Sequence, residues 1–294
     1  MLNIKNLSKT YSDGTQALKN INLSLPSGMI GLLGPNGAGK STLLRTLATL
    51  QSPSTGEFTF DKIDAIRHPN ALRAQLGYLP QNFGVYPHMS CVSLLEHMAV
   101  LKGIRNKKQL QQQIHRLLEL TNLTQFANKN VTDFSGGMRQ RFGIAQALLG
   151  DPKLVIMDEP TAGLDPAERD RLHDLLVTVS KDKLVLLSTH IVEDIENLCH
   201  HVALINSGKI IDNGPVQTLI EPLQNKLWLT HEKPTNGDIV LSKSYRYGQP
   251  HYRVFSESAP SQEALSINPT LQDRYFFDLT EGSVLPKEAL RHAS

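Results

Sequence analysis

The sequence has little cysteine and little net charge, and each shortage excludes a class of protein. Its 294 residues include two cysteines, Cys91 and Cys199, which are too few for a disulfide framework and indicate reducing surroundings. The formal net charge is only +2, and the longest basic cluster, at residues 105–108, has no interleaved aromatic residues. This is not the charge pattern of a nucleic-acid-binding protein, so we expect no nucleic-acid partner.

Long hydrophobic runs are also absent from the sequence. No run approaches the roughly 18 apolar residues that a membrane-spanning helix needs. The amino-terminal segment Met1-Leu2-Asn3-Ile4-Lys5 lacks the apolar stretch of a secretion signal, so we expect a chain that stays in the cytoplasm. A histidine pair follows Cys199, but no second Cys or His pair stands at a zinc-like spacing, which favours a structural role for these residues.

A glycine-rich segment is the most informative feature that is present. It reads Gly34-Pro35-Asn36-Gly37-Ala38-Gly39-Lys40-Ser41-Thr42 and fits the pattern G-x-x-x-x-G-K-[ST], between an apolar run at 29–33 and a helix-like run at 43–50. Because glycine tolerates positive φ, successive N–H groups can point at phosphate oxygens, with the positive end of the next helix behind them. We expect Lys40 to reach the outer phosphates and Ser41 to place its hydroxyl on Mg²⁺. The segment predicts a nucleoside-triphosphate site.

The apolar pattern predicts an α/β core that carries inserts. Short apolar or alternating segments between turn clusters indicate strands at residues 2–7, 17–25, 57–60, 154–157 and 184–188. The first three suggest a small antiparallel element, and the last two, joined by a helix over 166–180, form a parallel βαβ unit. Helical spacing at 90–103 and 107–122 predicts a helical insert over about residues 82–150.

The composition changes after Pro222. A hairpin-like pair over 201–213 and a short helix ending near Ile220 lead up to this point. Beyond it, residues 223–294 carry the only tryptophan, several Tyr and Phe, and two polar breaks, which predicts a small β-rich appendage with its own core. We therefore expect one domain over residues 1–222 and an accessory domain over 223–294.

Two carboxylates follow the predicted strand 154–157. Asp158 and Glu159 stand at its carboxyl end, where parallel strands present ligands. Asp158 suits the holding of Mg²⁺, directly or through water, and Glu159 suits the polarisation of the attacking water. Such a pair is weak evidence alone, but together with the glycine-rich segment it predicts hydrolysis of the triphosphate.

These segments, with Phe134-Ser135-Gly136-Gly137-Met138, resemble the ATP-binding subunit of an ABC transporter across about residues 1–220. The family writes the last segment LSGGQ, so Phe134 and Met138 replace Leu and Gln while Ser-Gly-Gly is intact. Ser135 and the two glycines can open a helix with free N–H groups for an anion. The resemblance implies a P-loop NTPase core with an antiparallel β subdomain and a helical subdomain. It further implies that Ser135, Gly136 and Gly137 complete an ATP site on the opposite subunit of a head-to-tail dimer.

The resemblance implies roles for further residues. Gln81 corresponds to the glutamine that senses Mg²⁺ and the attacking water, and its carboxamide can act as donor and acceptor. His190 resembles the switch histidine that bonds the γ-phosphate, and residues 162–165 resemble the loop that crosses the dimer interface. Tyr11 is positioned like the aromatic residue that stacks on adenine, although a surface tyrosine on a strand edge is the alternative.

The implied function is hydrolysis of ATP, with Mg²⁺ as cofactor, to power a separate integral membrane permease. The chain would lie as a peripheral homodimer at the cytoplasmic face of the inner membrane. The permease would dock near residues 81–95, where Phe83, Val85, Tyr86 and Met89 offer an apolar surface or else fill the core of the helical insert. The segment from Ser135 to Arg141, the appended carboxyl-terminal region and residues 271–276 resemble bacterial ABC-2-type exporters, which favours export.

Two other functions compete with transport. A non-transport ABC ATPase acting on DNA or ribosomes usually carries a long coiled coil or tandem cassettes, and the sequence has neither. A nucleotide-dependent regulatory module with weak turnover would not need the catalytic carboxylate of Glu159. The cargo lies outside what the sequence can indicate, because substrate contacts belong to the membrane subunit.

Overall fold

The computed structural model describes residues 1–234 and 237–281. The chain forms two compact units, Met1–Ile210 and a second one that begins at Ile211, and each is described by itself. Both cysteines are buried, as expected of small apolar residues, and burial raises the pKa of Cys91 to about 12. No helix in the described residues is long and apolar enough to cross a membrane.

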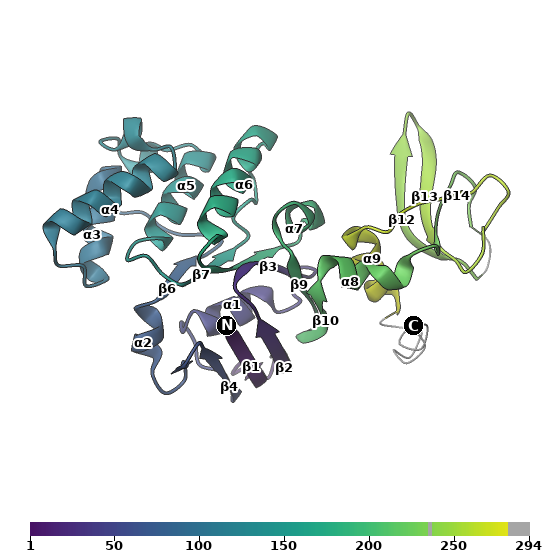
Figure 1. Cartoon of the computed structure of the whole chain (residues 1–294), viewed down its shortest axis with the longest axis horizontal. Helices are drawn as coiled ribbons and strands as arrows, with labels where there is room; N and C mark the ends of the chain where they lie inside the picture. The colour runs from purple at the N-terminus through teal and green to yellow at the C-terminus, as the bar shows by residue number, and fades with distance from the viewer. Residues whose placement is uncertain (235–236, 282–294) are drawn as a thin grey trace. The chain divides into compact units, whose positions relative to one another are not determined.

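Five strands of a six-stranded sheet form the centre of the first unit, and the sixth, β10 (Lys209–Pro215), runs past the boundary at Ile211 (Figure 1). The strands of this sheet, in spatial order, are β10, β9 (His201–Asn206), β3 (Gly28–Leu33), β8 (Leu184–Thr189), β7 (Leu154–Asp158) and β6 (Leu76–Leu79). The pairs from β9 to β6 are all parallel. Strands β7 and β8 are buried along their whole length, which explains their continuous apolar sequence. The predicted parallel βαβ unit is confirmed.

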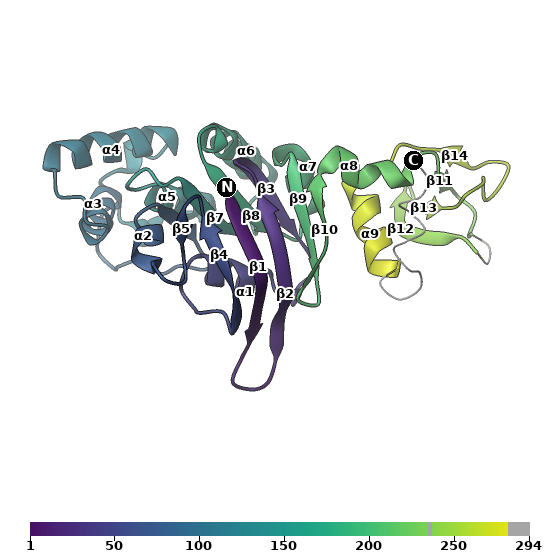
Figure 2. The same cartoon turned by 60° about the horizontal axis from the view of Figure 1, so that its bottom comes forward.

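A smaller antiparallel sheet packs beside this core. Its order is β2 (Gln16–Leu25), β1 (Leu2–Thr10), β4 (Thr55–Phe60) and β5 (Ile63–Asp64), and Figure 2 shows β1 and β2 as a long hairpin. Leu2, Leu18 and Phe58 of this sheet share one apolar cluster with Leu43 of α1 (Lys40–Leu47) and Ile156 of β7. Burial of this cluster holds the two sheets and the first helix together, as the predicted antiparallel subdomain requires.

Helices fill the interval between β6 and β7. They are α3 (Cys91–Leu101), α4 (Lys107–Leu120) and α5 (Gly136–Ala147), and they confirm the predicted helical subdomain (Figure 1). Each begins at a side-chain cap, because the side chains of Ser90, Asn106 and Ser135 accept hydrogen bonds from backbone N–H groups in the first turn. A shorter helix, α2 (Pro69–Arg73), precedes β6.

Two helices follow β7 and β8, the strands that end directly before Glu159 and His190. Helix α6 (Pro166–Ser180) begins at Asp165, whose side chain accepts from the N–H of Glu168, and it has the predicted bounds. Helix α7 (Val192–Leu198) follows β8 and lies against α6 and β3. Helix α1 starts at Lys40 rather than at the predicted residue 43, because the phosphate loop ends at Gly39.

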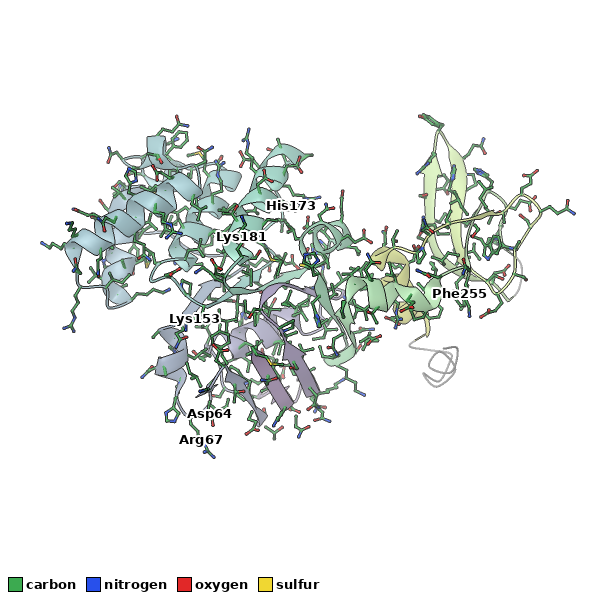
Figure 3. The ribbon with its side chains drawn as sticks, viewed as in Figure 1. Asp64, Arg67, Lys153, His173, Lys181 and Phe255 are labelled. Carbon is green, nitrogen blue, oxygen red and sulfur yellow. The ribbon has the colours of Figure 1, made fainter. Side chains whose placement is uncertain are left out.

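The second unit has an antiparallel sheet of order β12-β13-β11-β14, with β11 (Leu227–Thr230), β12 (Ile239–Arg246), β13 (Gln249–Phe255) and β14 (Leu265–Ser266). Its core joins Leu223, Leu227 and Leu241 to Phe277 of α9 (Leu271–Glu281). The ring of Phe255, labelled in Figure 3, packs at a tilt against that of Phe277, with the ring centroids 4.7 Å apart. The β-rich appendage with its own core is therefore present, and α9 completes it. Residues 282–294 of the expected accessory domain lie outside the described residues.

The boundary between the units lies earlier than the sequence suggested. The composition change at Pro222 set the expected boundary, whereas the second compact unit begins at Ile211. Arg274 of α9 explains the difference, because its guanidinium donates to the backbone oxygen of Leu219, in α8 (Val216–Ile220), and to Asp212, both at 3.0 Å. These contacts attach the segment before Pro222 to the second unit.

Candidate nucleotide-binding site

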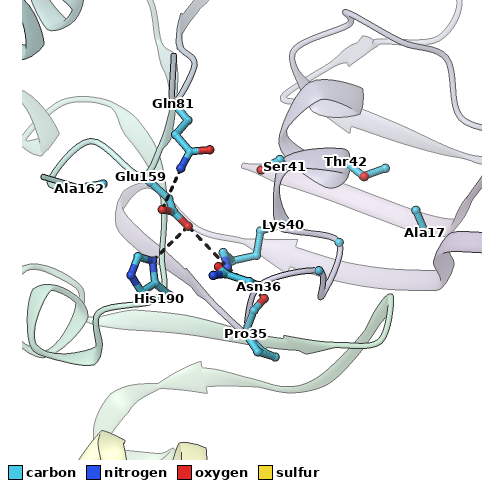
Figure 4. Close-up of a pocket in the computed structure, with 12 residues that line it drawn as sticks. Ala17, Pro35, Asn36, Lys40, Ser41, Thr42, Gln81, Glu159, Ala162 and His190 are labelled. Carbon is cyan, nitrogen blue, oxygen red and sulfur yellow. Dashed lines mark hydrogen bonds and ion pairs between the residues drawn. The ribbon is translucent and has the colours of Figure 1, made fainter.

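The carboxyl ends of three adjacent parallel strands meet at one edge of the central sheet. Strand β3 runs into the phosphate loop, β7 ends next to Glu159, and β8 ends next to His190. The cleft that they border, shown in Figure 4, has a volume of about 580 Å³. It is lined by Ala17, Pro35, Asn36, Gly37, Gly39, Lys40, Ser41, Thr42, Gln81, Glu159, Ala162 and His190. Ligands of open α/β sheets bind at such an edge.

The phosphate loop has the backbone shape of an anion cradle. Gly39 has a φ of 104° and a β-carbon there would come within 2.7 Å of the backbone oxygen of Ala17, so only glycine fits. It is also the N-cap of α1, and no side chain caps that helix. The N–H groups of its first turn therefore face the cleft without a side-chain acceptor, at the positive end of the helix dipole. A phosphate group fits this donor set.

Lys40 points into the cleft from the first residue of α1. Its Nζ donates to the backbone oxygens of Gly34 at 2.7 Å and Pro35 at 3.2 Å, and it lies 3.7 Å from Oε1 of Glu159. Burial lowers the pKa of Lys40, and the carboxylates of Glu159 and Asp158 oppose that shift. A buried ammonium group next to a phosphate loop is suited to hold a further anion.

Glu159 is the centre of the site. Its carboxylate accepts a hydrogen bond from Nε2 of Gln81 at 3.2 Å and lies 3.2 Å from Nδ1 of His190, as Figure 4 shows. The backbone of Glu159 has a φ of 51°, in the left-handed region that residues other than glycine seldom adopt. Its N–H donates to the backbone oxygen of Ser188 at 3.0 Å. The predicted Gln81, Lys40 and His190 thus converge on one carboxylate.

Asp158 lies one residue behind this carboxylate. It is 2% exposed, does not line the cleft, and accepts a hydrogen bond from Oγ of Ser188 at 2.6 Å. Among the described residues, no three His, Cys, Asp or Glu side chains are close enough to form a metal site by themselves. Mg²⁺ needs fewer, because it usually keeps several waters and binds one or two protein groups plus substrate phosphates. The hydroxyl of Ser41, the amide of Gln81 and the carboxylate of Asp158 fit that chemistry.

The Ser-Gly-Gly segment is not part of the cleft. Ser135 caps α5, where its Oγ accepts from the N–H of Met138 at 3.3 Å, and both Ser135 and Gly136 are exposed. Gly137 is buried, and a β-carbon there would lie 2.5 Å from Oε2 of Glu168 in α6. The structure therefore separates this segment from the residues that surround Lys40.

Tyr11 lies next to the cleft without lining it. Its hydroxyl is 3.2 Å from Oγ1 of Thr42 and donates to Oε1 of Gln51 at 3.3 Å, and its side chain is 37% exposed. Ala17 lines the cleft and was not anticipated, because a small apolar residue in a predicted strand carries no chemical signal. Ser188 was also missed as a partner of Asp158, although it stands two residues before His190.

The fold and the cleft define a P-loop nucleotide-binding ATPase, and three comparisons narrow this class. The family model described as "ABC transporter" matches residues 18–162. The chain is 37% identical over 267 residues, 87% of its length and 86% of the relative's, to the uncharacterized ABC transporter ATP-binding protein YxlF of Bacillus subtilis (strain 168). It is 38% identical to the Nod factor export ATP-binding protein I of Cupriavidus metallidurans, over 75% of this chain and 73% of that one.

Solved structures agree with the sequence relatives. The dimeric structure of MJ0796, a bacterial ABC transporter cassette, superposes with a TM-score of 0.67 at 27% identity, covering 73% of this chain and 98% of that one. A second structure of MJ0796 is a dimeric post-hydrolysis state bound to ADP and Pi. The chain belongs to the family of ABC transporter ATP-binding proteins. It is an ATPase subunit of the ABC type, as the sequence predicted.

Proposed function

We propose that the chain works as a homodimer that binds two ATP molecules with Mg²⁺ and powers export through a separate membrane permease. The observation that carries the proposal is the convergence of Lys40, Gln81 and His190 on the carboxylate of Glu159, beside the phosphate loop. A carboxylate held at 3.2 Å by an amide and an imidazole is positioned to orient and polarise one attacking water.

Each residue then has a defined task. Free backbone N–H groups of the phosphate loop and of the first turn of α1 cradle the phosphates, and Lys40 stabilises the charge that develops on the transferred group. Ser41, Gln81 and Asp158 would hold Mg²⁺, which neutralises charge on the outer phosphate oxygens. His190 bonds the γ-phosphate and keeps Glu159 in place. Tyr11 stacks on the adenine ring from the edge of the cleft.

The exposed Ser-Gly-Gly segment supports a site shared between two chains. Ser135 and Gly136 are exposed and lie apart from the cleft of their own chain. In the proposed head-to-tail dimer, Ser135, Gly136 and Gly137 of each chain contact the γ-phosphate that the other chain binds, at the amino end of α5. Hydrolysis removes this shared anion and releases the two chains. The dimeric cassette MJ0796 supports the arrangement.

The permease is proposed to dock on the segment that follows Gln81. In this segment Tyr86 is 50% exposed and stacks edge-on against His97 at 5.5 Å. Phe83 instead packs against α5, since a β-carbon at Gly143 would come within 2.7 Å of its ring. Tyr86 is therefore the apolar contact that we assign to the partner. The Nod factor export protein among the relatives and the variant Ser-Gly-Gly segment support export at the cytoplasmic face of the inner membrane.

The test of this proposal is ATP-driven dimerisation of the Glu159→Gln chain. We expect this variant to lose about 10² to 10⁴ of the hydrolysis rate, the usual contribution of a positioned acid or base, and to remain a dimer in saturating MgATP. Light scattering measures the mass, and the matched control is Glu57→Gln, an exposed glutamate in β4. Monomers at saturating MgATP, or wild-type turnover by Glu159→Gln, would contradict the proposal.

A second measurement identifies the partner. The full chain, purified from gently solubilised membranes, is expected to retain an integral membrane protein. Exchange of Tyr86 for Ser should reduce this recovery without changing ATP hydrolysis by the isolated chain. Recovery of ribosomes or DNA instead would favour the non-transport ATPase and remove the permease from the proposal.

A further inference from the structure

A fully buried carboxylate lies behind the catalytic cleft. Asp194 in α7 is 0% exposed and has partners from two other segments of the chain. Oγ1 of Thr161 donates to its Oδ2 at 2.5 Å, Nε2 of His173 lies 3.0 Å from its Oδ1, and Nε of Arg169 lies 3.7 Å from the same oxygen. A buried carboxylate is costly unless it is paired, so these contacts hold the three segments in one arrangement.

The partners of Asp194 belong to the segments that carry the site. Thr161 stands two residues after Glu159, and Asp194 stands four residues after His190. Arg169 and His173 belong to α6, which begins directly after the loop 162–165, and Figure 3 labels His173 on this helix. Asp194 therefore connects the chain after Glu159, the chain after His190 and the helix after the interface loop.

In the part of the chain that the structure describes, the start of α7 has few polar contacts besides those of Asp194 and the pair of Glu193 with Arg169. Its N-cap residue, Ile191, offers no side-chain cap, and the N–H of Ile191 donates to Oγ1 of Thr189 at 2.9 Å. The bond from Thr161 to Asp194 ties α7 to the turn after Glu159, in addition to the packing of α7 against α6 and β3. Glu159 stands two residues before Thr161, and His190 stands four residues before Asp194. Nδ1 of His190 and Oε1 of Glu159 lie 3.2 Å apart.

We propose that Asp194 is a positioning residue for hydrolysis, which acts through Thr161 to keep Glu159 and His190 in catalytic alignment. This proposal rests on the roles proposed above for Glu159 and His190. Asp194 touches neither nucleotide nor water in this scheme, because it is enclosed by Thr161, His173 and Arg169. Loss of the bond would let the two catalytic side chains separate while the phosphate loop stays intact.

The sharpest test changes the hydroxyl of Thr161 in two ways. Thr161→Val keeps the shape and removes the donor, whereas Thr161→Ser keeps the donor. We expect Thr161→Val to lower kcat for ATP about tenfold, since small misplacement of reacting groups is costly, with KM changed by less than about twofold. Thr161→Ser should retain most of the kcat. Circular dichroism checks that both variants are folded at the assay temperature.

Asp194→Leu gives the second arm of the test, because leucine has a similar volume and no oxygen that can accept from Thr161, and Glu193→Gln is its control. Glu193 is the adjacent residue, its side chain is 73% exposed, and it approaches Arg169 only at 3.9 Å. We expect Asp194→Leu to lose kcat as Thr161→Val does and the double variant to lose little more, because both changes break the same contact. Glu193→Gln should keep wild-type kcat.

Three outcomes would overturn the inference: wild-type kcat in Thr161→Val, an equal loss in Thr161→Ser, or an equal loss in Glu193→Gln. The Glu159→Gln variant, assayed alongside, separates this result from the proposed function. If Glu159→Gln stops hydrolysis and Thr161→Val does not slow it, only the role of Asp194 fails. If Glu159→Gln hydrolyses ATP at the wild-type rate, the catalytic assignment itself fails.

Discussion

The phosphate-loop cleft and the Ser-Gly-Gly segment differ in how much of a site each one forms within a single chain. In the cleft, the carboxylate of Glu159 is contacted by three side chains of the same chain, those of Lys40, Gln81 and His190. In the Ser-Gly-Gly segment, the hydroxyl of Ser135 contacts only its own helix among the residues that the structure describes. The polar side chains of the cleft therefore come together within one chain, whereas the exposed segment would meet a ligand only in the proposed dimer.

The largest effect on ATP binding is expected from Lys40→Ala, which removes the ammonium group from the cleft. Truncating a buried charged partner costs about 2 kcal/mol or more, so the Kd for ATP should rise at least about 30-fold. Nucleotide titration of the isolated chain measures this loss. Lys62→Ala, an exposed lysine between β4 and β5, is the control and should bind normally. Tight binding by Lys40→Ala would break the comparison, because the cleft would not depend on its own cation.

Lys40, Glu159 and His190 could be placed in one cleft from the sequence because each follows the end of a strand, whereas Ala17 carries no such signal. Lys40 follows β3, Glu159 follows β7 and His190 follows β8, and parallel strands bring their carboxyl ends to one edge. A local motif next to each strand was therefore enough. Apolar periodicity was likewise enough to predict the α/β core and the helical subdomain that the structure contains.

Contacts between distant residues could not be predicted in this way. Thr161 and Asp194 carry no motif that pairs them, and only the packing of α7 against α6 brings them together. The buried Phe277 of α9 likewise completes a β-rich core that the sequence pattern described without it. Apolar periodicity predicts which side of an element is buried, but not which distant element covers it.

A smaller effect is expected from Ser135→Ala, which sharpens the comparison. The isolated chain should bind ATP with unchanged affinity, because Ser135 does not line its cleft. Turnover by the dimer should fall about tenfold, the value of one hydrogen bond to a charged group. Steady-state ATPase assays measure kcat and KM.

Ser90→Ala is the matched control for this variant. Ser90 caps α3 as Ser135 caps α5, with its Oγ accepting from the N–H of Ser93 at 3.2 Å. Either substitution should destabilise its helix by about 1 kcal/mol, but only Ser135→Ala should slow turnover. An equal fall in turnover for both variants would mean that Ser135 is merely a helix cap.

The smallest effect is expected at the edge of the cleft, where Tyr11 has two possible roles. Stacking on adenine is worth at least about 1 kcal/mol, so Tyr11→Ala should raise the Kd for ATP about fivefold. Tyr11→Phe keeps the ring and removes the hydroxyl that contacts Thr42 and Gln51, so its affinity should match that of the wild type. If Tyr11→Ala binds ATP normally, Tyr11 is a surface residue that braces Thr42. The base would then gain no stacking energy from this ring, and the phosphate contacts of the cleft would account for the affinity.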